Sequence, residues 1–112
     1  MESVKSSAEA YADGTPLVIL FGPPARTKII SALLGERDMD LNTSDIARLA
    51  GVARSTVYDH LDDLETLGVV EQTRMVGRSP MYRIDAESEI VEHISAVEGL
   101  TLRRLYELED DR

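Results

Sequence analysis

Residues 43–83 read TSDIARLAGVARSTVYDHLDDLETLGVVEQTRMVGRSPMYR, and this stretch decides the fold. It holds two short helical patterns that meet at a corner glycine, Gly51, and two strand patterns that meet at a second glycine, Gly77. The order helix, turn, helix, hairpin predicts a winged helix-turn-helix.

The first helix of this stretch begins with a capping pattern. Asn42, followed by an acidic residue three positions later, is typical of a helix start, and Thr43 is an alternative cap. The helix is expected to run to Ala50 and to turn Ile46, Leu49 and Ala50 toward the core.

The second helix is expected to span Arg54 to Leu67 and to end at Gly68. Val57, Leu61 and Leu64 are spaced by four and then three residues, so they lie on one side of it. Its opposite side is polar. After it, the sequence predicts strands at 69–76 and 81–85 around the loop Gly77-Arg78-Ser79-Pro80.

The flanks complete the predicted fold. A helix that starts near Pro24 is expected to end at Gly35, and Asp85 is expected to cap a last helix that reaches about Glu109. A one- to three-residue strand is expected at Leu41. The predicted class is therefore mainly α with a small β-hairpin (α+β), a winged helix-turn-helix with an added C-terminal helix.

The composition fits one globular domain of 112 residues, 43% hydrophobic and 29% charged. Because the chain has no cysteine, disulfides, thiolate metal sites and thiol catalysis are excluded. No apolar run approaches the roughly 20 residues that a membrane span needs. No signal peptide is evident, and a cytoplasmic location is expected.

The charge balance is unusual for a protein that binds nucleic acid. The net charge is −9, with 21 acidic and 12 basic residues, whereas attraction to phosphates normally requires a basic face. Residues 84–112 carry nine acids and three arginines, so most of the excess lies away from the helix-turn-helix. An acidic surface with only two lysines resembles proteins of salt-loving archaea, where salt screens self-repulsion.

The polar side of the second helix suits a duplex. A major groove about 12 Å wide admits one helix, whose N-terminal end usually lies closest to the bases. The candidate DNA contacts on this helix are Arg54, Ser55, Thr56, Tyr58 and Asp59.

The hairpin adds positive charge. Arg74, Arg78 and Arg83 occur with no acid between Gln72 and Ile84, so we expect them to hold the wing against the backbone or the minor groove. One alternative is a solvated helix face that binds nothing. Another is a winged helix that serves protein–protein interaction without DNA binding, which the acidic total and Asp59 favour.

The motifs DIARLAGVARSTVYDHLDDLETLGVV and RMVGRSPMYRI resemble winged helix-turn-helix transcriptional regulators of the ArsR/MarR-like kind. LFGPPARTKIISALL resembles the helix that precedes them in such regulators. The resemblance implies a homodimeric DNA-binding regulator. From this and from the residues together we expect sequence-specific binding to double-stranded DNA, no cofactor and no enzymatic activity, with an unknown small-molecule effector. Ala53 departs from the family's frequent serine cap, and Asp59 departs from its usual basic or amide residue.

The last helix carries two apolar stripes, wider than one helix needs to cover its own core. They are expected to pack against a second copy of the chain, with packing back on the first helix as the alternative. The candidate dimer residues are Ile90, Ile94, Val97, Leu102 and Leu105. The expected segments are a flexible N-terminal tail (1–15), a winged-helix DNA-binding domain (16–85) and a C-terminal dimerisation helix (86–112).

Other charged residues point to no catalytic or metal site. His60 and His93 are the only histidines, which argues against metal sensing, and His60 is expected to pack or to contact phosphate. The pair Asp62-Asp63 is expected to be solvated. Arg26 and Lys28, in the helix predicted from Pro24 to Gly35, are possible contacts to the DNA backbone.

Overall fold

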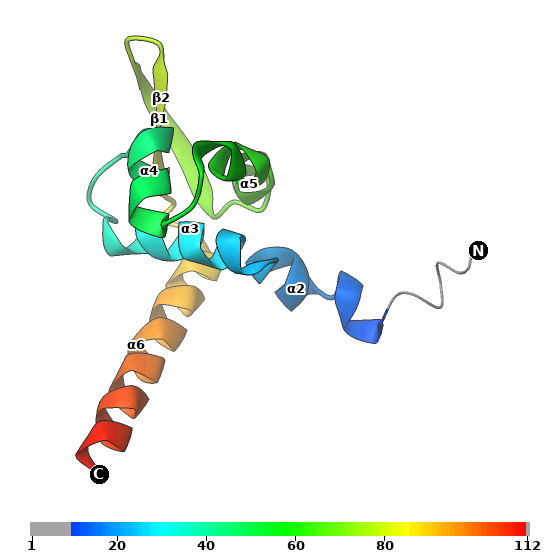
Figure 1. The fold of residues 1–112 in the computed structure, drawn as a ribbon, viewed down its shortest axis with the longest axis vertical. Coiled ribbons are helices and arrows are strands. Elements are labelled where there is room, and N and C mark those ends of the chain that lie inside the picture. The colour runs from blue at the N-terminus through cyan, green and yellow to red at the C-terminus, as the bar shows by residue number, and fades with distance from the viewer. Residues whose placement is uncertain (1–9, 112) are drawn as a thin grey trace.

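The computed structural model describes residues 10–111 and is mainly helical, with a two-stranded hairpin projecting from one end (Figure 1). The elements in chain order are the 3-10 helix η1 (Tyr11–Gly14), α2 (Pro16–Phe21), α3 (Pro24–Gly35), α4 (Thr43–Ala50), α5 (Arg54–Thr66), β1 (Val70–Val76), β2 (Ser79–Ile84) and α6 (Glu89–Asp110). The predicted fold class, a winged helix-turn-helix with an added C-terminal helix, is confirmed. Of the predicted N-terminal tail, residues 1–9 lie outside the described residues.

The core forms where α3, α4 and α5 pack together beneath the hairpin. The apolar stripe of α3 is buried, as are Val57, Leu61 and Leu64 on the inner side of α5, as the spacing predicts. Burying side chains of this size contributes about 1.5–3 kcal/mol each before the cost of ordering the chain. The core therefore fixes which side of α5 is left to solvent.

One predicted core residue on α4 is wrong. Leu49 was predicted to face the core but is 42% exposed. Ala47, which was not predicted to face the core, is buried. The buried arc of α4 is centred between Thr43, Ile46, Ala47 and Ala50. At 3.6 residues per turn Leu49 lies about 110° from that centre, outside the arc.

The corner between α4 and α5 follows the predicted chemistry. The Asn42 side chain accepts a hydrogen bond from the Asp45 amide at 2.8 Å, which caps α4. Gly51 ends α4 with φ at +72°, a left-handed conformation that favours glycine. Ala53 precedes α5 and offers no side-chain cap, so no side chain of the capping position accepts from the first amides of α5.

The hairpin is longer than predicted on its second strand. β2 begins at Ser79 and not at Met81, so the turn is the tight pair Gly77-Arg78, with φ of +62° at the glycine. The register shifts between Gln72 and Arg74, which leaves Thr73 as the extra residue of a bulge. The predicted strand at Leu41 is an isolated bridge to β2.

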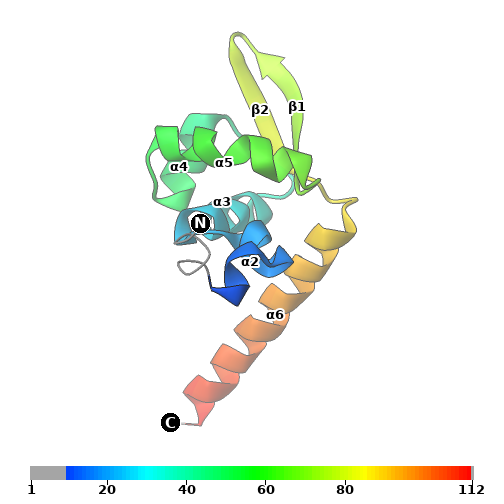
Figure 2. The same ribbon diagram turned by 90° about the vertical axis from the view of Figure 1, so that its right-hand side faces the viewer.

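Helix α6 begins later than predicted and leaves the body of the molecule (Figure 2). Ser88, and not Asp85, caps it by accepting from the Val91 amide at 3.3 Å. Asp85 instead accepts from the Glu87 amide at 3.0 Å and shapes the preceding turn. Val91 is buried against the core, but most later side chains of α6 are exposed.

The apolar residues Leu17 to Phe21, which were not predicted to be helical, lie in helix α2. No helix within residues 10–111 is long and apolar enough to cross a membrane.

Candidate nucleic-acid interface

The outer side of α5 carries the predicted reading residues. Arg54, Ser55, Tyr58 and Asp59 are exposed, and Thr56 is half-buried at the first turn. They lie outside the buried side of the helix, which is formed by Val57, Leu61 and Leu64, and Arg54 and Thr56 stand at the two edges of the arc that they cover. The structure thus brings the five predicted α5 contacts together on one surface at the N-terminal half of the helix.

Tyr58 is held in place by the neighbouring helix. Its hydroxyl shares a hydrogen bond with the Thr43 hydroxyl at 3.2 Å, and Thr43 is buried at the start of α4. This bond, together with one to Arg54, lowers the pKa of the Tyr58 hydroxyl from its usual value. The ring is still 51% exposed, so α4 orients a side chain that α5 presents to solvent. The sequence suggested Thr43 only as an alternative cap.

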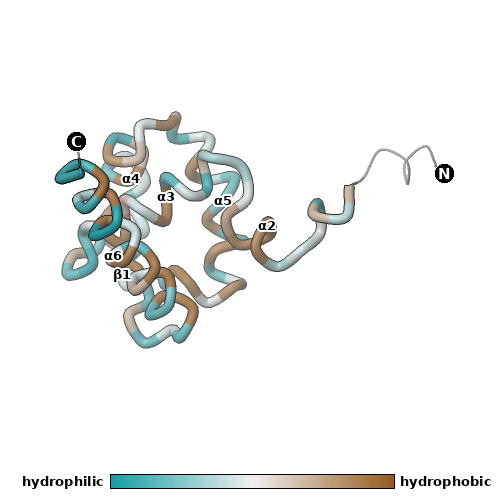
Figure 3. Tube along the Cα trace, turned by 90° about the horizontal axis from the view of Figure 1, so that it is seen from below, coloured by the Kyte–Doolittle hydropathy of each residue, from teal (hydrophilic) through white to brown (hydrophobic). Residues whose placement is uncertain are grey.

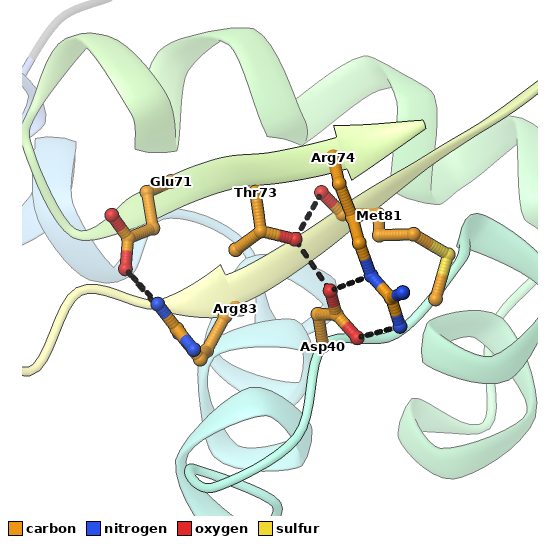
Figure 4. Close-up of polar contacts among 6 residues, drawn as sticks. All are labelled: Asp40, Glu71, Thr73, Arg74, Met81 and Arg83. Carbon is orange, nitrogen blue, oxygen red and sulfur yellow. Dashed lines mark hydrogen bonds and ion pairs between the residues drawn. The ribbon is translucent and has the colours of Figure 1, made fainter. Parts of the chain in front are cut away.

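The first wing arginine, Arg74, is paired with an acid from outside the hairpin (Figure 4). Its Nε and Nη2 donate to the two Asp40 carboxylate oxygens at 2.9 and 3.3 Å. The Thr73 hydroxyl, placed by the bulge, donates to the same carboxylate at 2.6 Å. The Arg74 hydrogen bond, followed by that of Thr73, lowers the pKa of Asp40 to about 2.

The last of the wing arginines, Arg83, is paired across the hairpin. Arg83 stands opposite Glu71 in the strand register, and its Nη2 donates to the Glu71 carboxylate at 3.1 Å (Figure 4). Arg78 is exposed at the turn, and within residues 10–111 no ion pair includes it. The three wing arginines are therefore not equivalent in charge, a difference that was not predicted.

The prediction that Arg26 could contact the DNA backbone is wrong, because the Arg26 side chain is buried and only 9% exposed. Its Nη2 donates to Asp63 at 2.6 Å, and its Nε donates to His60 Nδ1 at 3.1 Å. Asp63 is thus an ion-pair partner and not merely a solvated charge. His60 is half-buried and accepts a hydrogen bond from Arg26. Lys28 is exposed on α3.

The predicted dimer residues of α6 stand mainly on its exposed side. Ile94 packs partly against the core, whereas Val97, Leu102 and Leu105 are at least half exposed. Leu108, which belongs to one of the two predicted stripes, is exposed as well, and so are Leu100 and Tyr106, which belong to neither stripe. Seen from below, hydrophobic segments occur on both α2 and α6 (Figure 3).

An apolar groove of about 660 Å³ lies between α2, α3 and α6. Leu17, Leu20 and Phe21 of α2 form one wall, and Ile90 and Val97 of α6 form part of another. We refer to this feature as the α2–α6 groove. In the part of the chain that is described, no group of three or more His, Cys, Asp or Glu residues is placed to hold a metal ion.

Residues 23–72 match the family of bacterial regulatory proteins known as the arsR family. This segment covers α3, α4, α5 and the start of β1, so the similarity to that family lies in the helix-turn-helix. It ends before the three wing arginines and α6. No curated protein matches the sequence.

Solved structures share the fold. The antimony-specific transcriptional repressor AntR is 22% identical with a TM-score of 0.62, and the match covers 96% of this chain and 99% of AntR. The transcriptional repressor BigR from Xylella fastidiosa is 16% identical with a TM-score of 0.62, over 91% of this chain and 96% of BigR. The homodimeric winged helix-turn-helix DNA-binding domain of Mb0332 from Mycobacterium bovis is 20% identical with a TM-score of 0.57, over 90% of this chain and 94% of that domain.

Proposed function

We propose, from the arsR-family match across residues 23–72, that this chain is a sequence-specific, double-stranded DNA-binding transcriptional regulator that acts as a homodimer. The observation that carries the proposal is the exposed polar side of α5, braced by α3 and α4 within the matched segment. A helix that is packed on one side and presents such a polar side at its N-terminal half has the form of a major-groove reader.

In this proposal the α5 contacts divide by chemistry. Ser55 and Thr56 stand beside the amides of the first turn, which have no side-chain cap and favour a phosphate. Tyr58, held by Thr43, presents its ring to a sugar or a thymine methyl group. Asp59 accepts from the amino group of a cytosine, and Arg54 contacts a base edge or a phosphate.

The wing contributes contacts that do not depend on sequence. Arg78 carries a charge that no acid within residues 10–111 neutralises, and it lies at the turn, where a side chain reaches the backbone or the minor groove. Arg74 and Arg83 approach phosphates with part of their charge already offset by Asp40 and Glu71. The net electrostatic attraction between the wing and DNA phosphates is therefore smaller than the presence of three arginines suggests.

The proposed dimer joins two copies through α6 and the α2–α6 groove. Most large apolar side chains of α6 are exposed in the single chain, and the Mb0332 domain with the same fold is homodimeric. In this assembly Ile90, Ile94, Val97, Leu102 and Leu105 are buried between the copies. A two-fold dimer places its two α5 helices about one DNA turn, roughly 34 Å, apart.

A mobility-shift assay on duplex genomic fragments tests DNA recognition. We expect the protein to shift a subset of fragments and Tyr58→Ala to weaken that binding about tenfold. This is about 1.4 kcal/mol, at the lower end of the roughly 1–3 kcal/mol of a good base-edge contact. Arg104→Gln, which removes an exposed ion pair on α6, is the control and should bind as the wild type does. Equal shifts of all fragments, or wild-type binding by Tyr58→Ala, would contradict base reading by α5.

A second candidate is a winged helix that binds a basic protein and no DNA. The net charge of −9 and the internal pairing of Arg74 and Arg83 favour it. It predicts no shift of any duplex and a complex with a basic partner that dissociates as salt rises.

The source of the chain in a salt-loving archaeon also stays a prediction, which rests on composition alone.

A further inference from the structure

The buried arginine of α3 connects three helices. Arg26 donates from Nη1 to the Ile19 carbonyl of α2 at 2.6 Å, while its Nε and Nη2 donate to His60 and Asp63 of α5. One side chain thus satisfies a carbonyl near the C-terminal end of α2 and holds the helix that carries the proposed reading residues. We call this set of contacts the Arg26 clamp.

The local backbone is shaped around the same side chain. Gly22, between α2 and α3, has φ at +52°, and a Cβ added there would stand 3.1 Å from Arg26 Cδ and 3.2 Å from its Nε. A side chain at this position would have to displace the arginine. The Thr27 hydroxyl donates to the Phe21 carbonyl at 2.9 Å, which gives α2 a second attachment to α3 that does not involve α5.

The helix held by the clamp is also a wall of the α2–α6 groove. Leu17, Leu20 and Phe21 of α2 line the groove, and Ile19, whose carbonyl the clamp holds, lies between them in sequence. Because α2 has only six residues, a displacement of its groove side moves its carbonyls as well. The clamp is therefore a direct polar connection between the groove and α5.

We infer that Arg26 is a positioning residue that transmits occupation of the α2–α6 groove by a second copy of the chain to the orientation of α5. The inference rests on the proposed homodimer. When the partner chain fixes α2, the clamp restrains His60 and Asp63, and α5 becomes less mobile. By linkage, whatever orders α5, including DNA, strengthens the dimer by the same factor.

Amide hydrogen exchange tests this without DNA. The full chain is measured well below and well above the dimer dissociation constant, which sedimentation gives for each variant. In the wild type we expect dimerisation to slow exchange in the peptide covering residues 54–66 about fivefold or more. Asp63→Ala removes one arm of the clamp at an exposed position, and should reduce the slowing in α5 to less than about twofold while α6 is protected as before.

Two further variants separate coupling from folding. Asp62→Ala makes the same change at the neighbouring exposed residue, and should keep the wild-type response of α5. Arg26→Met removes all three bonds and should behave as Asp63→Ala does. If both clamp variants dimerise and α5 responds as in the wild type, or if wild-type α5 does not respond, Arg26 does not couple the two sites. A chain that sediments as a monomer at every concentration overturns the homodimer and the coupling together, and leaves DNA binding to its own assays.

Discussion

Single residues of the wing differ in how much positive charge they offer a duplex. Arg74 and Arg83 each have a carboxylate within 3.1 Å, whereas Arg78 has no acidic partner in the described part of the chain. An arginine that is already paired displaces fewer ions from DNA than a free one does. The wing should therefore act electrostatically mainly through its turn.

Replacing Arg78 by alanine should weaken binding by a similar factor on every sequence. The slope of log K against log salt should fall by about 0.9, the value of one phosphate contact. Arg74→Ala is the matched comparison and should lower the slope less, because Asp40 offsets its charge. Filter binding at several salt concentrations measures both, and an unchanged slope for Arg78→Ala would remove this residue from the interface.

Asp40 makes the stability of the folded chain depend on pH in acid. Its pKa is lowered from 3.8 to about 2 in the folded chain, so its contribution is complete above about pH 4 and is lost as pH falls toward 2. Between these values unfolding takes up almost one proton at this site. We expect Asp40→Asn to be less stable than the wild type at neutral pH and to lose less stability on acidification. Urea unfolding from pH 5 to pH 2.5 measures this, and parallel pH profiles would show that the Arg74 pair contributes nothing.

At the scale of elements, the core of α5 and the exposed side of α4 should respond differently to truncation. Leu64→Ala removes a fully buried side chain and should lower the free energy of unfolding by about 2–5 kcal/mol. Leu49→Ala, at the position wrongly predicted to face the core, should cost about 1 kcal/mol or less. Chemical denaturation gives both values, and similar losses would mean that Leu49 is more buried in solution.

Helices with a strong repeat could be predicted from the sequence. In α3 and α5 apolar residues recur at helical spacing, and a glycine stands at the end of α3 and just after the end of α5. In α4, with eight residues, two small alanines and one leucine share the apolar positions, so composition alone does not show which side is buried. The six residues that form α2 are too few for a helical repeat of apolar residues to predict a helix there.

The polar contacts could not be predicted in the same way. Asp40 and Arg74 are 34 residues apart, and Arg26 and Asp63 are 37 apart. No local pattern marks such pairs, because they depend on how the elements pack. The list of exposed α5 residues could be predicted, since exposure follows from the helical repeat, but the neutralisation of two wing arginines could not.

At the scale of the whole molecule, the proposed homodimer accounts for the projecting α6, because a partner chain would cover it. Its long exposed apolar face would be costly in a monomer, and its first turns alone pack on the core. The same helix carries much of the acidic excess, which keeps negative charge away from the hairpin and α5.

Leu105→Glu should therefore convert the dimer to a monomer. A charge placed in the apolar interface loses its water and finds no partner, which should raise the dimer dissociation constant at least 100-fold, or about 2.7 kcal/mol. Ala96→Glu adds the same charge on another side of α6 and should leave the dimer intact. Sedimentation velocity distinguishes the two, and a dimeric Leu105→Glu would place the interface elsewhere.

The central claim is that two α5 helices read a duplex from a two-fold dimer. Enrichment of random double-stranded DNA by the purified chain, at several salt concentrations, tests it most directly. We predict recovery of an inverted repeat whose half-sites are about one helical turn, 10–10.5 base pairs, or a multiple of it apart. Recovery of no common sequence at any salt concentration would contradict the account.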